Sequence, residues 1–555
     1  MRWEHGTLTY HQLNTRAHHL AQNLINHGIT PGMDVPVLMR RSHHTIITFL
    51  AILKTGAAYQ PLHTDLPPHR LQQLLAHNPC PLVITDTTLA HHPGLTHHHT
   101  LTSDHTTYQT TSPHHPLPTV RPQDTAYTMH TSGTTGTPKA IAITHQSIVD
   151  LATDPAWNLQ PHHRVLFHAP HAFDASTYEI WAPLLHGAQT VIAPDETTDT
   201  TALTHLIPTH HITHLSLTAG MFRVIVEEDP HSLTGLTEIT TGGDTISPTA
   251  VTRLLTTHPH MTVRTTYGPT ETTLCATQQP WTHTHNPTGP TGPVPLGHPM
   301  HHTGLLLLDP YLQPVPPGVQ GELYITGTGL ARGYTHQPAL TATHFTANPH
   351  PHTPGTRMYR TGDLAHWTPH GDLIFNGRTD HQVKIRGYRI EPAEIETTLT
   401  SLDHITDALV TTHTTHGHKH LTAYTVPAPG HQLDPHHIRE QTTHLLPDYM
   451  VPTTVIVLPH GLPLTTNGKI DHTALPTPDP TTTHTHQPPR TPREEILCTL
   501  FAHTLGLDTV GTTDDFFALG GHSLLATQLI ARIRTTLGIH TKVRTLFENP
   551  TVQRL

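Results

Sequence analysis

The stretch with the clearest chemical potential is residues 131–139, TSGTTGTPK, which combines glycines, hydroxyl side chains and a lysine. Gly133 and Gly136 let the backbone turn with positive φ and aim several N–H groups at one point, which suits a bound anion such as phosphate. The common nucleotide loop has four residues between its glycines and a Ser or Thr after its lysine. Here there are two, and Ala140 follows Lys139. On these residues alone, a Thr- and Gly-rich surface loop is the alternative.

Ten further motifs accompany this loop along the chain. Two of them precede the loop, LTYHQL and LKTGAAYQPL. The others follow it in the order FDAS, YGPTETT, GELYITGTGLARGY, YRTGDL, GRTDHQVKIRGYRIE, LPDYMVP, NGKID and DFFALGGHS. The chain thereby resembles the adenylation domain and following carrier domain of a non-ribosomal peptide synthetase, within the adenylate-forming ligase superfamily. The resemblance covers nearly the whole sequence, and the motifs keep the family's order.

The resemblance implies that the 131–139 loop wraps the β- and γ-phosphates of ATP. Hydroxyl and backbone N–H groups then follow the departing pyrophosphate, and a lysine adds positive charge. The residues assigned to this task are Thr131, Ser132, Gly133, Thr134, Thr135, Gly136 and, as a catalytic residue, Lys139.

The same resemblance assigns further ATP contacts. Tyr267 stacks on the purine, Thr270 binds phosphate, and Glu271 is the carboxylate for Mg²⁺, a hard cation that prefers oxygen ligands. Asp363 accepts hydrogen bonds from the ribose hydroxyls, and Arg378 approaches the same sugar. Asp380 matches the hinge about which a small domain turns between the two half-reactions.

Two residues near the C-terminus complete the implied reaction. Lys469, in NGKID, is the principal catalytic candidate because an ammonium stabilises the negative charge that develops when a carboxylate attacks the α-phosphorus. Ser523, in DFFALGGHS, matches the serine that receives 4′-phosphopantetheine; an N-cap role at the following helix is compatible with that. The sequence therefore predicts adenylation first and thioester formation second.

The substrate pocket is carried over by position from the family. Asp174 matches an acidic residue that pairs with an α-ammonium group, whereas fatty-acid, acetate and aryl-acid ligases usually lack it. The other predicted lining residues are Ala175, Tyr178, Ser216, Thr240, Gly242, Thr266, Leu274 and Cys275. Because this set adds no charge, it favours a neutral side chain. His168 and His171 are candidates for the substrate entrance, or else ordinary loop histidines.

Composition limits the other possibilities. With 29 Lys+Arg against 40 Asp+Glu, the formal charge of -11 favours neither nucleic acid nor a membrane surface as a partner. Three dispersed cysteines and the lack of a signal-like start predict a cytoplasmic protein. The 60 histidines are scattered without metal-ligand spacing; metal analysis tests the alternative of a metal-binding protein.

Hydrophobic patterning indicates the elements that must position these residues. Residues 8–25 place Leu13, Ala17, Leu20, Ala21 and Leu24 at helical spacing after a short strand-like opening. Apolar and helical segments then alternate, which predicts α/β layering, and short strands with Pro and Gly turns follow from about residue 300.

We therefore predict an α/β and α+β multidomain protein with a layered α/β core and a β-rich subdomain. The expected divisions are a large adenylation subdomain at 1–378, a small α+β subdomain at 379–476, a Pro/Thr-rich linker at 477–492 and a carrier bundle of three or four helices at 493–555. Compared with the family, the chain looks N-terminally short, as a fragment of a larger assembly line does.

The implied partners are an amino acid, a phosphopantetheinyl transferase, neighbouring condensation or release domains and a small helper protein, in secondary-metabolite or antibiotic biosynthesis. Two alternatives stay open. One is a stand-alone acyl-CoA-type ligase, against which the carrier and Asp174 argue. The other is a catalytically decayed scaffold, because Thr265 and Ala140 depart from the family's usual Asn and Gly.

Overall fold

The computed structural model describes residues 1–555 apart from 77, 105–115, 134–137, 196–199, 352–353, 386, 416–417, 466–468, 478–486, 518, 520, 522, 540, 542–544 and 547–548. Contacts divide the chain into two units. The large unit comprises residues 1–132, 138–197 and 204–389, and the second unit comprises residues 133–137, 198–203 and 390–555.

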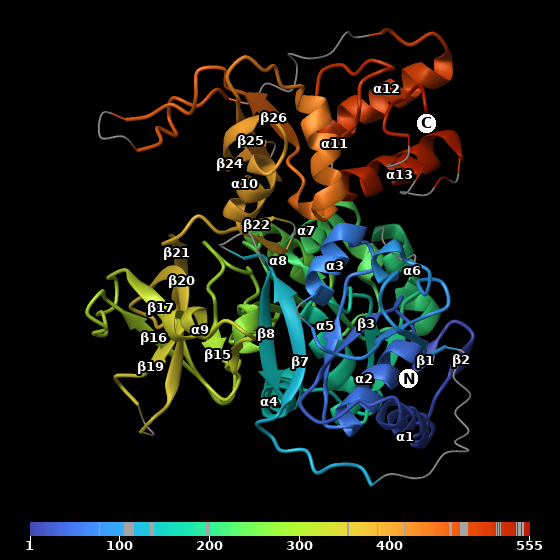
Figure 1. The fold of residues 1–555 in the computed structure, drawn as a ribbon, viewed down its shortest axis with the longest axis vertical. Coiled ribbons are helices and arrows are strands. Elements are labelled where there is room, and N and C mark those ends of the chain that lie inside the picture. Colours follow the sequence, from blue (N-terminus) through green and yellow to red (C-terminus); the bar gives the residue numbers. More distant parts are fainter. Residues whose placement is uncertain are drawn as a thin grey trace. The chain divides into compact units, whose positions relative to one another are not determined.

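The large unit contains a seven-stranded sheet built mainly from the first third of the chain (Figure 1). Its order is β18 (Gly333–Tyr334), β8 (Lys139–Thr144), β7 (Thr125–Thr131), β4 (Ala58–Pro61), β3 (Asp34–Leu38), β5 (Val83–Thr85) and β6 (Thr100–Thr102). The β7–β8 pair is antiparallel and places Lys139 opposite Thr131. The two ends of the predicted phosphate loop are therefore fixed by one hairpin.

A nine-stranded sheet follows, with mostly parallel pairing. Its order is β15 (His298–Pro299), β14 (Thr277–Trp281), β13 (Thr262–Tyr267), β12 (Glu238–Gly242), β11 (His214–Thr218), β9 (Arg164–Phe167), β10 (Gln189–Ile192), β1 (Arg2–Trp3) and β2 (Gly6–Thr7). Strands β11, β12 and β13 are parallel, so their carboxyl ends share one edge of the sheet. Ligand sites in α/β sheets form at such edges.

Helices alternate with these strands, as the periodicity predicts. They are α1 (Tyr10–Asn26), α2 (His43–Lys54), α3 (Pro68–Ala76), α4 (His145–Ala152), α5 (Ala175–Leu185), α6 (Thr200–His210), α7 (Ala219–Glu228) and α8 (Pro248–Thr257). Helix α1 starts at a capping box formed by Thr9 and Gln12 and buries the predicted apolar face. Five short 3₁₀ segments also occur among the described residues: η1 (Pro93–Leu95), η2 (Pro155–Trp157), η3 (Pro230–Leu233), η4 (Thr270–Thr272) and η5 (Asp448–Met450).

The predicted β-rich region is a five-stranded antiparallel sheet. It contains β16 (Thr303–Leu308), β17 (Gly321–Gly327), β20 (Arg357–Trp367) and β19 (Phe345–Ala347) in that order, and β21 (Leu373–Arg378) pairs with β20. Helix α9 (Pro338–His344) lies next in sequence to β19, and the short strands β22 (Val383–Ile385) and β23 (Tyr388–Ile390) pair with each other.

The second unit contains an α+β part and a helical part. The α+β part has α10 (Pro392–Thr400), α11 (Pro435–Leu445) and a sheet of β24 (Ile405–Thr415), β25 (His418–Pro427) and β26 (Thr454–Val457). The helical part has α12 (Pro492–Leu505) and α13 (Ser523–Leu537) within its described residues. Leu497, Phe501, Phe516, Leu529 and Leu546 are among the residues that form its own apolar core.

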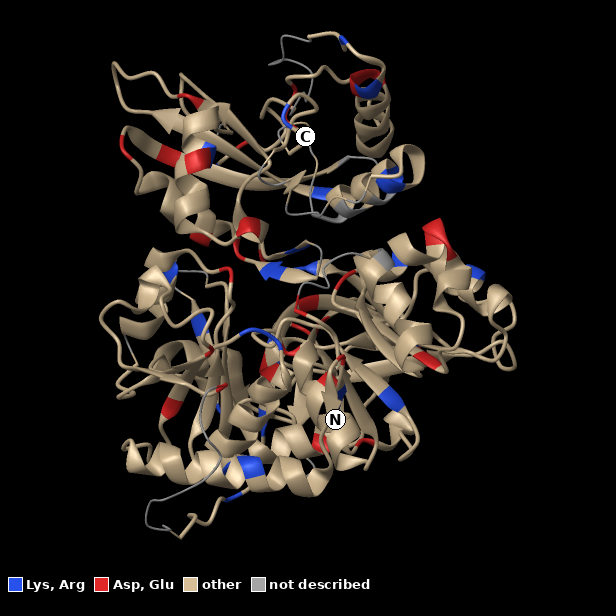
Figure 2. Ribbon diagram, turned by 90° about the vertical axis from the view of Figure 1, so that its right-hand side faces the viewer, with Lys and Arg blue, Asp and Glu red and all other residues tan. Residues whose placement is uncertain are grey.

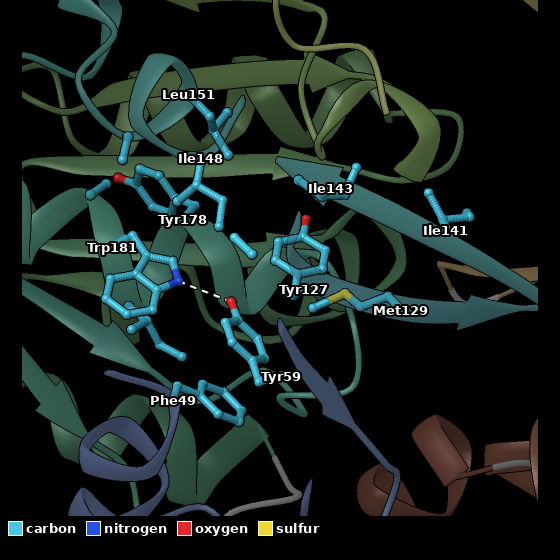
Figure 3. Packing of buried hydrophobic residues seen from close by; sticks show 14 of the residues in the cluster. Phe49, Tyr59, Tyr127, Met129, Ile141, Ile143, Ile148, Leu151, Tyr178 and Trp181 are labelled. Atoms are coloured by element: carbon cyan, nitrogen blue, oxygen red, sulfur yellow. Dashed lines mark hydrogen bonds between the residues drawn. The ribbon is translucent and has the colours of Figure 1, made fainter. Parts of the chain in front are cut away.

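Buried aromatic side chains form much of the core of the large unit. Figure 3 shows Tyr59 and Trp181 joined by a hydrogen bond from the indole Nε1 to the tyrosine hydroxyl, at 3.1 Å. Tyr59 also stacks on Phe49, with ring centroids 4.1 Å apart. This packing holds α5, which carries predicted pocket residues, against the strands around it.

The predicted layered α/β core, β-rich subdomain, small α+β subdomain and helical C-terminal domain are confirmed. Figure 2 shows a ribbon that is largely uncharged, consistent with only 12% charged residues. Among the described residues, none of the helices combines the length and apolar character required to cross a lipid bilayer.

Candidate active site

Several predicted site residues meet at the carboxyl edge of the parallel strands in the nine-stranded sheet. Gly242 ends β12 and Tyr267 ends β13. A Cβ atom on Gly242 would lie 2.5 Å from the carbonyl oxygen of Thr266, so the close approach of these two strands requires glycine. Thr273 and Leu274, beyond η4, both have left-handed backbone angles, with φ of 59° and 70°. Strain of this kind is concentrated at functional sites.

Asp174 lies at the start of α5 with its carboxylate directed to η4. The Thr270 hydroxyl donates a hydrogen bond to Asp174 Oδ2 at 2.5 Å. Burial raises the pKa of Asp174, and the Thr270 hydrogen bond and nearby Lys384 oppose this rise. The structure thus brings together the residues predicted for the substrate ammonium and for phosphate. A partly buried carboxylate of this type gains stability from a cationic ligand.

Tyr267, Asp363 and Arg378 form one connected polar group. The Tyr267 hydroxyl and Arg378 Nη1 each donate to a different carboxylate oxygen of Asp363. Arg378 Nε and Nη2 also donate hydrogen bonds to the two carboxylate oxygens of Asp380, at 2.7 and 2.9 Å. The predicted ribose and hinge residues therefore share one arginine. Its guanidinium opposes the effect of burial and lowers the pKa of Asp380.

Glu271 is completely buried and ionised. Its two carboxylate oxygens accept hydrogen bonds from the Tyr334 hydroxyl at 2.8 Å and from Arg389 Nη1 at 2.6 Å. Burial alone would raise the pKa of Glu271, but Arg389, hydrogen bonds and Lys139 hold it at about 2. An ionised carboxylate suits Mg²⁺, which proteins commonly bind through one or two carboxylates together with substrate phosphates. The donor set therefore fits a metal that arrives with ATP.

The described part of the phosphate loop contacts anionic and carbonyl oxygens. The Ser132 hydroxyl donates to the backbone carbonyl of Arg389 at 2.7 Å, and the Thr131 hydroxyl is buried with no hydrogen-bond partner among the described residues. Within the second unit, the Gly133 N–H donates to a carboxylate oxygen of Glu394 at 2.9 Å. An amide of the loop thus already binds an anionic group. The predicted residues Thr134, Thr135 and Gly136 lie outside the described residues.

Residues 383–389 contribute contacts that the sequence analysis did not assign individually. Lys384 Nζ lies 5.5 Å from the ring centroid of Tyr267, and burial lowers the pKa of Lys384. The Tyr388 ring packs edge-on against Phe173, with centroids 5.0 Å apart. The sequence signal was available, because these residues belong to the quoted segment VKIRGYRI, but the pairing of Arg389 with Glu271 depends on tertiary structure.

The predicted pocket residues come from four elements of the large unit and the segment after η4. Ala175 and Tyr178 lie on α5, Ser216 on β11, Thr240 and Gly242 on β12, Thr266 on β13, and Leu274 and Cys275 follow η4. Burial raises the pKa of the Cys275 thiol to about 12, so it is protonated at neutral pH. The sequence analysis missed a buried ion pair between Glu238 and Arg264 on the same two strands. The pocket region is therefore not free of further charge.

Of the two candidate entrance histidines, His171 is buried and His168 is half-buried, and His168 has a clear packing role. His168 Nε2 lies 2.5 Å from the Ser216 carbonyl oxygen, and its backbone N–H donates to Glu179 at 2.9 Å. These contacts connect α5 to β11. Within the part of the chain that the structure describes, no group of three or more His, Cys, Asp or Glu side chains is arranged to hold a metal ion.

In the second unit, Lys469 and Ser523 occupy different settings from the residues above. Lys469 is exposed, and its backbone N–H and carbonyl both bond to Thr465, at 3.2 and 2.7 Å. Ser523 is the first residue of α13. The N-terminus of a helix of this length favours an attached phosphate group.

Comparison with known families matches three consecutive segments. Residues 1–335 match the family described as AMP-binding enzyme, residues 394–469 match the AMP-binding enzyme C-terminal domain, and residues 495–555 match a phosphopantetheine attachment site. These matches follow the order predicted from the motifs.

Individual relatives agree with these matches. The chain is 41% identical over 557 residues to a dimodular nonribosomal peptide synthase of Bacillus subtilis (strain 168), and 40% identical over 563 residues to malpibaldin synthetase of Mortierella alpina. Both matches cover 99% of this chain but span only 23% and 10% of those relatives. The structure of holo-PA1221, an NRPS protein containing adenylation and PCP domains, matches with a TM-score of 0.86 and 30% identity, covering 100% of this chain and 92% of that chain.

Proposed function

Because the chain belongs to the AMP-binding enzyme family and has the adenylation and carrier domains of a nonribosomal peptide synthetase, we propose that it is an AMP-forming ligase that activates an α-amino acid and loads it onto its own carrier domain. The proposed boundaries are those expected from the sequence, with the adenylation region at 1–476 and the carrier at 493–555. The family membership supports the reaction class, and the site chemistry supports the substrate class.

The proposal that the substrate is an amino acid rests on the surroundings of the Asp174 carboxylate. This carboxylate is partly buried at the start of α5, burial raises its pKa, and the Thr270 hydroxyl of η4 donates a hydrogen bond to it at 2.5 Å. A substrate ammonium supplies the positive charge that favours the ionised form. A simple fatty or aryl acid has no group that does so.

In the first step, a carboxylate oxygen of the amino acid attacks the α-phosphorus of ATP, and pyrophosphate leaves with the electrons of the broken P–O bond. Asp174 holds the ammonium, Asp363 and Tyr267 hold the nucleoside, and Lys139 with the 131–136 loop accompanies the pyrophosphate. Lys469 stabilises charge on the entering and leaving oxygens. Glu271 would hold Mg²⁺, which neutralises phosphate charge when bound.

In the second step, the aminoacyl group leaves AMP and becomes a thioester. A 4′-phosphopantetheine group on Ser523 would supply the thiol, which would bond to the acyl carbon while AMP leaves with the electrons of the broken C–O bond. Its attachment requires a phosphopantetheinyl transferase. The lengths of the relatives support neighbouring synthetase domains as further partners, and a small helper protein is proposed only from the family resemblance. The residues of the large unit keep the adenylate in place until the acyl group departs.

Paired substrates test the amino-acid assignment. Pyrophosphate release should be measured with MgATP and a panel of amino acids, each alongside the same carboxylic acid without its amine. We expect kcat/KM to be roughly 30-fold or more higher for the amine-bearing member, because its absence leaves a buried charge unpaired. Equal turnover of both members would instead support an acyl-acid ligase.

A further inference from the structure

The carboxylate of Glu271, the predicted metal ligand, has a different donor on each of its two oxygens. The Tyr334 hydroxyl donates to Oε1 at 2.8 Å, and Arg389 Nη1 donates to Oε2 at 2.6 Å. The Glu271 side chain is fully buried, and that of Arg389 is only 15% exposed. One donor is neutral and the other is a cation. A metal ion that binds Oε2 therefore meets a group of like charge in a site that water screens little.

Tyr334 is held in place by backbone contacts of the large unit. It lies on β18, where it pairs with Ile141 of β8. Its N–H donates to the Thr341 hydroxyl at 2.9 Å, and the N–H of Ala331 donates to the Glu271 carbonyl oxygen at 2.8 Å. The backbone and the side chain of Glu271 thus both bind the segment that carries Tyr334. This donor is a fixed part of the site.

Arg389 is the residue at which the large unit ends, and Ile390 begins the longest segment of the second unit. It follows Asp380, the predicted hinge, so it belongs to the part of the chain that we expect to turn between the two half-reactions. Its backbone carbonyl accepts a hydrogen bond from the Ser132 hydroxyl of the phosphate loop at 2.7 Å. Movement of this segment would therefore release the carboxylate of Glu271 and the hydroxyl of Ser132 together.

Arg389 supplies Glu271 with the positive charge that a bound metal ion would also supply. Burial raises the pKa of Glu271, and the Arg389 guanidinium is the largest of the opposing effects that hold it at about 2. An ionised carboxylate at this depth is strongly destabilised when its cationic partner is removed without replacement. Mg²⁺, which prefers carboxylate and phosphate oxygens, is a suitable replacement. Glu271 therefore keeps a cationic partner throughout if Arg389 and Mg²⁺ exchange with each other.

We propose that Tyr334 is a positioning residue that orients Glu271 for the metal, and that Arg389 competes with the metal for the same carboxylate. Tyr334 keeps its oxygen in both situations, whereas the other oxygen binds either Arg389 or Mg²⁺. Binding of MgATP then requires Arg389 to withdraw from Glu271, and Arg389 returns when the metal departs. This inference rests on the proposed function.

A second carboxylate provides a matched control, because it has the same two types of partner. Glu322 accepts hydrogen bonds from Arg360 Nε and Nη2 at 2.8 and 3.0 Å and from the Tyr324 hydroxyl at 3.4 Å. The Arg360 side chain is 45% exposed, and Glu322 is not a predicted site residue. Substitutions here remove the same groups as at Glu271 but away from the predicted metal ligand.

The test measures binding rather than turnover. The ligand is the ATP analogue with a methylene bridge between its α- and β-phosphates, from which pyrophosphate cannot leave. Titration calorimetry on the purified full chain gives its Kd with excess Mg²⁺ and again with EDTA, and the ratio of the two is the gain in affinity due to the metal. The variants are Arg389→Gln, Arg389→Lys and Tyr334→Phe, with Arg360→Gln and Tyr324→Phe as controls. Melting temperatures of all proteins accompany the titrations.

The two partners of Glu271 should have effects of opposite sign. Arg389→Gln should increase the gain in affinity due to Mg²⁺ by at least about 5-fold, because a larger fraction of the chain has Glu271 available to the metal. Arg389→Lys, which keeps the charge but not the guanidinium, should give a smaller increase. Tyr334→Phe should decrease the gain by about 10-fold or more, because Glu271 loses the donor that orients it. Both controls should stay within about 2-fold of the unaltered chain.

Failure of this inference and failure of the proposed function give different results. A gain in affinity that both Arg389 variants leave unchanged or decrease would show that Arg389 does not compete with the metal, while the adenylation function stands. A gain that Tyr334→Phe leaves unchanged would limit Tyr334 to a role in packing. No binding of the analogue with either Mg²⁺ or EDTA, by a chain that melts cooperatively, would remove the proposed function and this inference with it.

Discussion

The large unit and the second unit carry their predicted functional side chains in opposite ways. In the large unit these groups are buried and joined to each other, as in the links of Glu271 to Arg389 and of Asp363 to Arg378. In the second unit Lys469 is exposed, and Ser523 opens a helix. A buried charge needs permanent partners, whereas a residue that acts by delivery to a site must be free to approach it.

This contrast teaches that loss of a single side chain should have different consequences in the two units. Substitutions in the second unit should abolish one half-reaction and leave the other intact. Substitutions in the large unit should affect binding, chemistry and stability together, because each side chain there also supports its neighbours.

The largest effect is expected for Ser523→Ala. The hydroxyl that receives 4′-phosphopantetheine is then absent, so treatment with a phosphopantetheinyl transferase should give no mass increase and no loading of amino acid. ATP–pyrophosphate exchange should stay within about 2-fold, because the large unit retains its site. Thr499→Ala, an exposed hydroxyl on α12, is the matched control. Loading that persists on Ser523→Ala would place the attachment elsewhere.

Lys469→Ala should have the second largest effect. We expect adenylation to fall by at least about 10²–10³-fold, because the cation that stabilises charge at the α-phosphorus is lost. Transfer of the acyl group from a preformed adenylate should be largely retained. Lys419→Ala, at a lysine on β25 of the same unit, controls for loss of surface charge. An equal decrease in both half-reactions would refute the separate role of Lys469.

Asp174→Asn should give a smaller but still large effect in the large unit. The amide keeps the shape and the contact with Thr270 but not the charge, so kcat/KM for the amino acid should decrease by roughly 30-fold or more. For the same acid without its amine, kcat/KM should decrease little. Asp65→Asn, whose side chain is 83% exposed, is the control. An equal loss for both acids would assign Asp174 to folding alone.

The smallest effect concerns acid stability of the large unit. Burial lowers the pKa of His130 and His168 to about 4 and that of His171 to about 3. The unfolded chain, with a histidine pKa near 6.5, therefore binds more protons than the folded chain between about pH 6.5 and 4. The free energy of unfolding should decrease as the pH falls through this range, and level off for each group below its folded pKa.

His130→Gln should flatten this pH dependence by up to about 1.4 kcal/mol per pH unit, which corresponds to one proton. Urea denaturation followed by tryptophan fluorescence, at several pH values between 4.5 and 7, measures the slope. A slope that does not change in His130→Gln would show that this histidine is protonated equally in the folded and unfolded chains.

The sequence predicted which residues make up the site better than it predicted which of their side chains form hydrogen bonds and ion pairs with one another. Motifs such as YGPTETT and YRTGDL predicted Glu271 and Asp363, and both occupy the expected large unit beside other motif residues. The buried apolar face of helix α1 was predicted because that face is set by local periodicity.

The sequence could not predict which side chains pair with one another, because this pairing depends on strand register and long-range packing. Arg264 meets Glu238 only once β12 and β13 pair, and the sequence analysis named neither residue. Similarly, Thr270 was predicted to bind phosphate, and in the structure its hydroxyl donates to Asp174. Roles for Lys469, Ser523 and the pocket residues stay predictions until they are measured.

The most direct test of the central claim is ATP–pyrophosphate exchange across a panel of amino acids, with Lys469→Ala as the blank. The account predicts exchange with a neutral α-amino acid that exceeds the blank by at least about 10²-fold. A folded chain that gives no exchange above the blank with any member of the panel would contradict it.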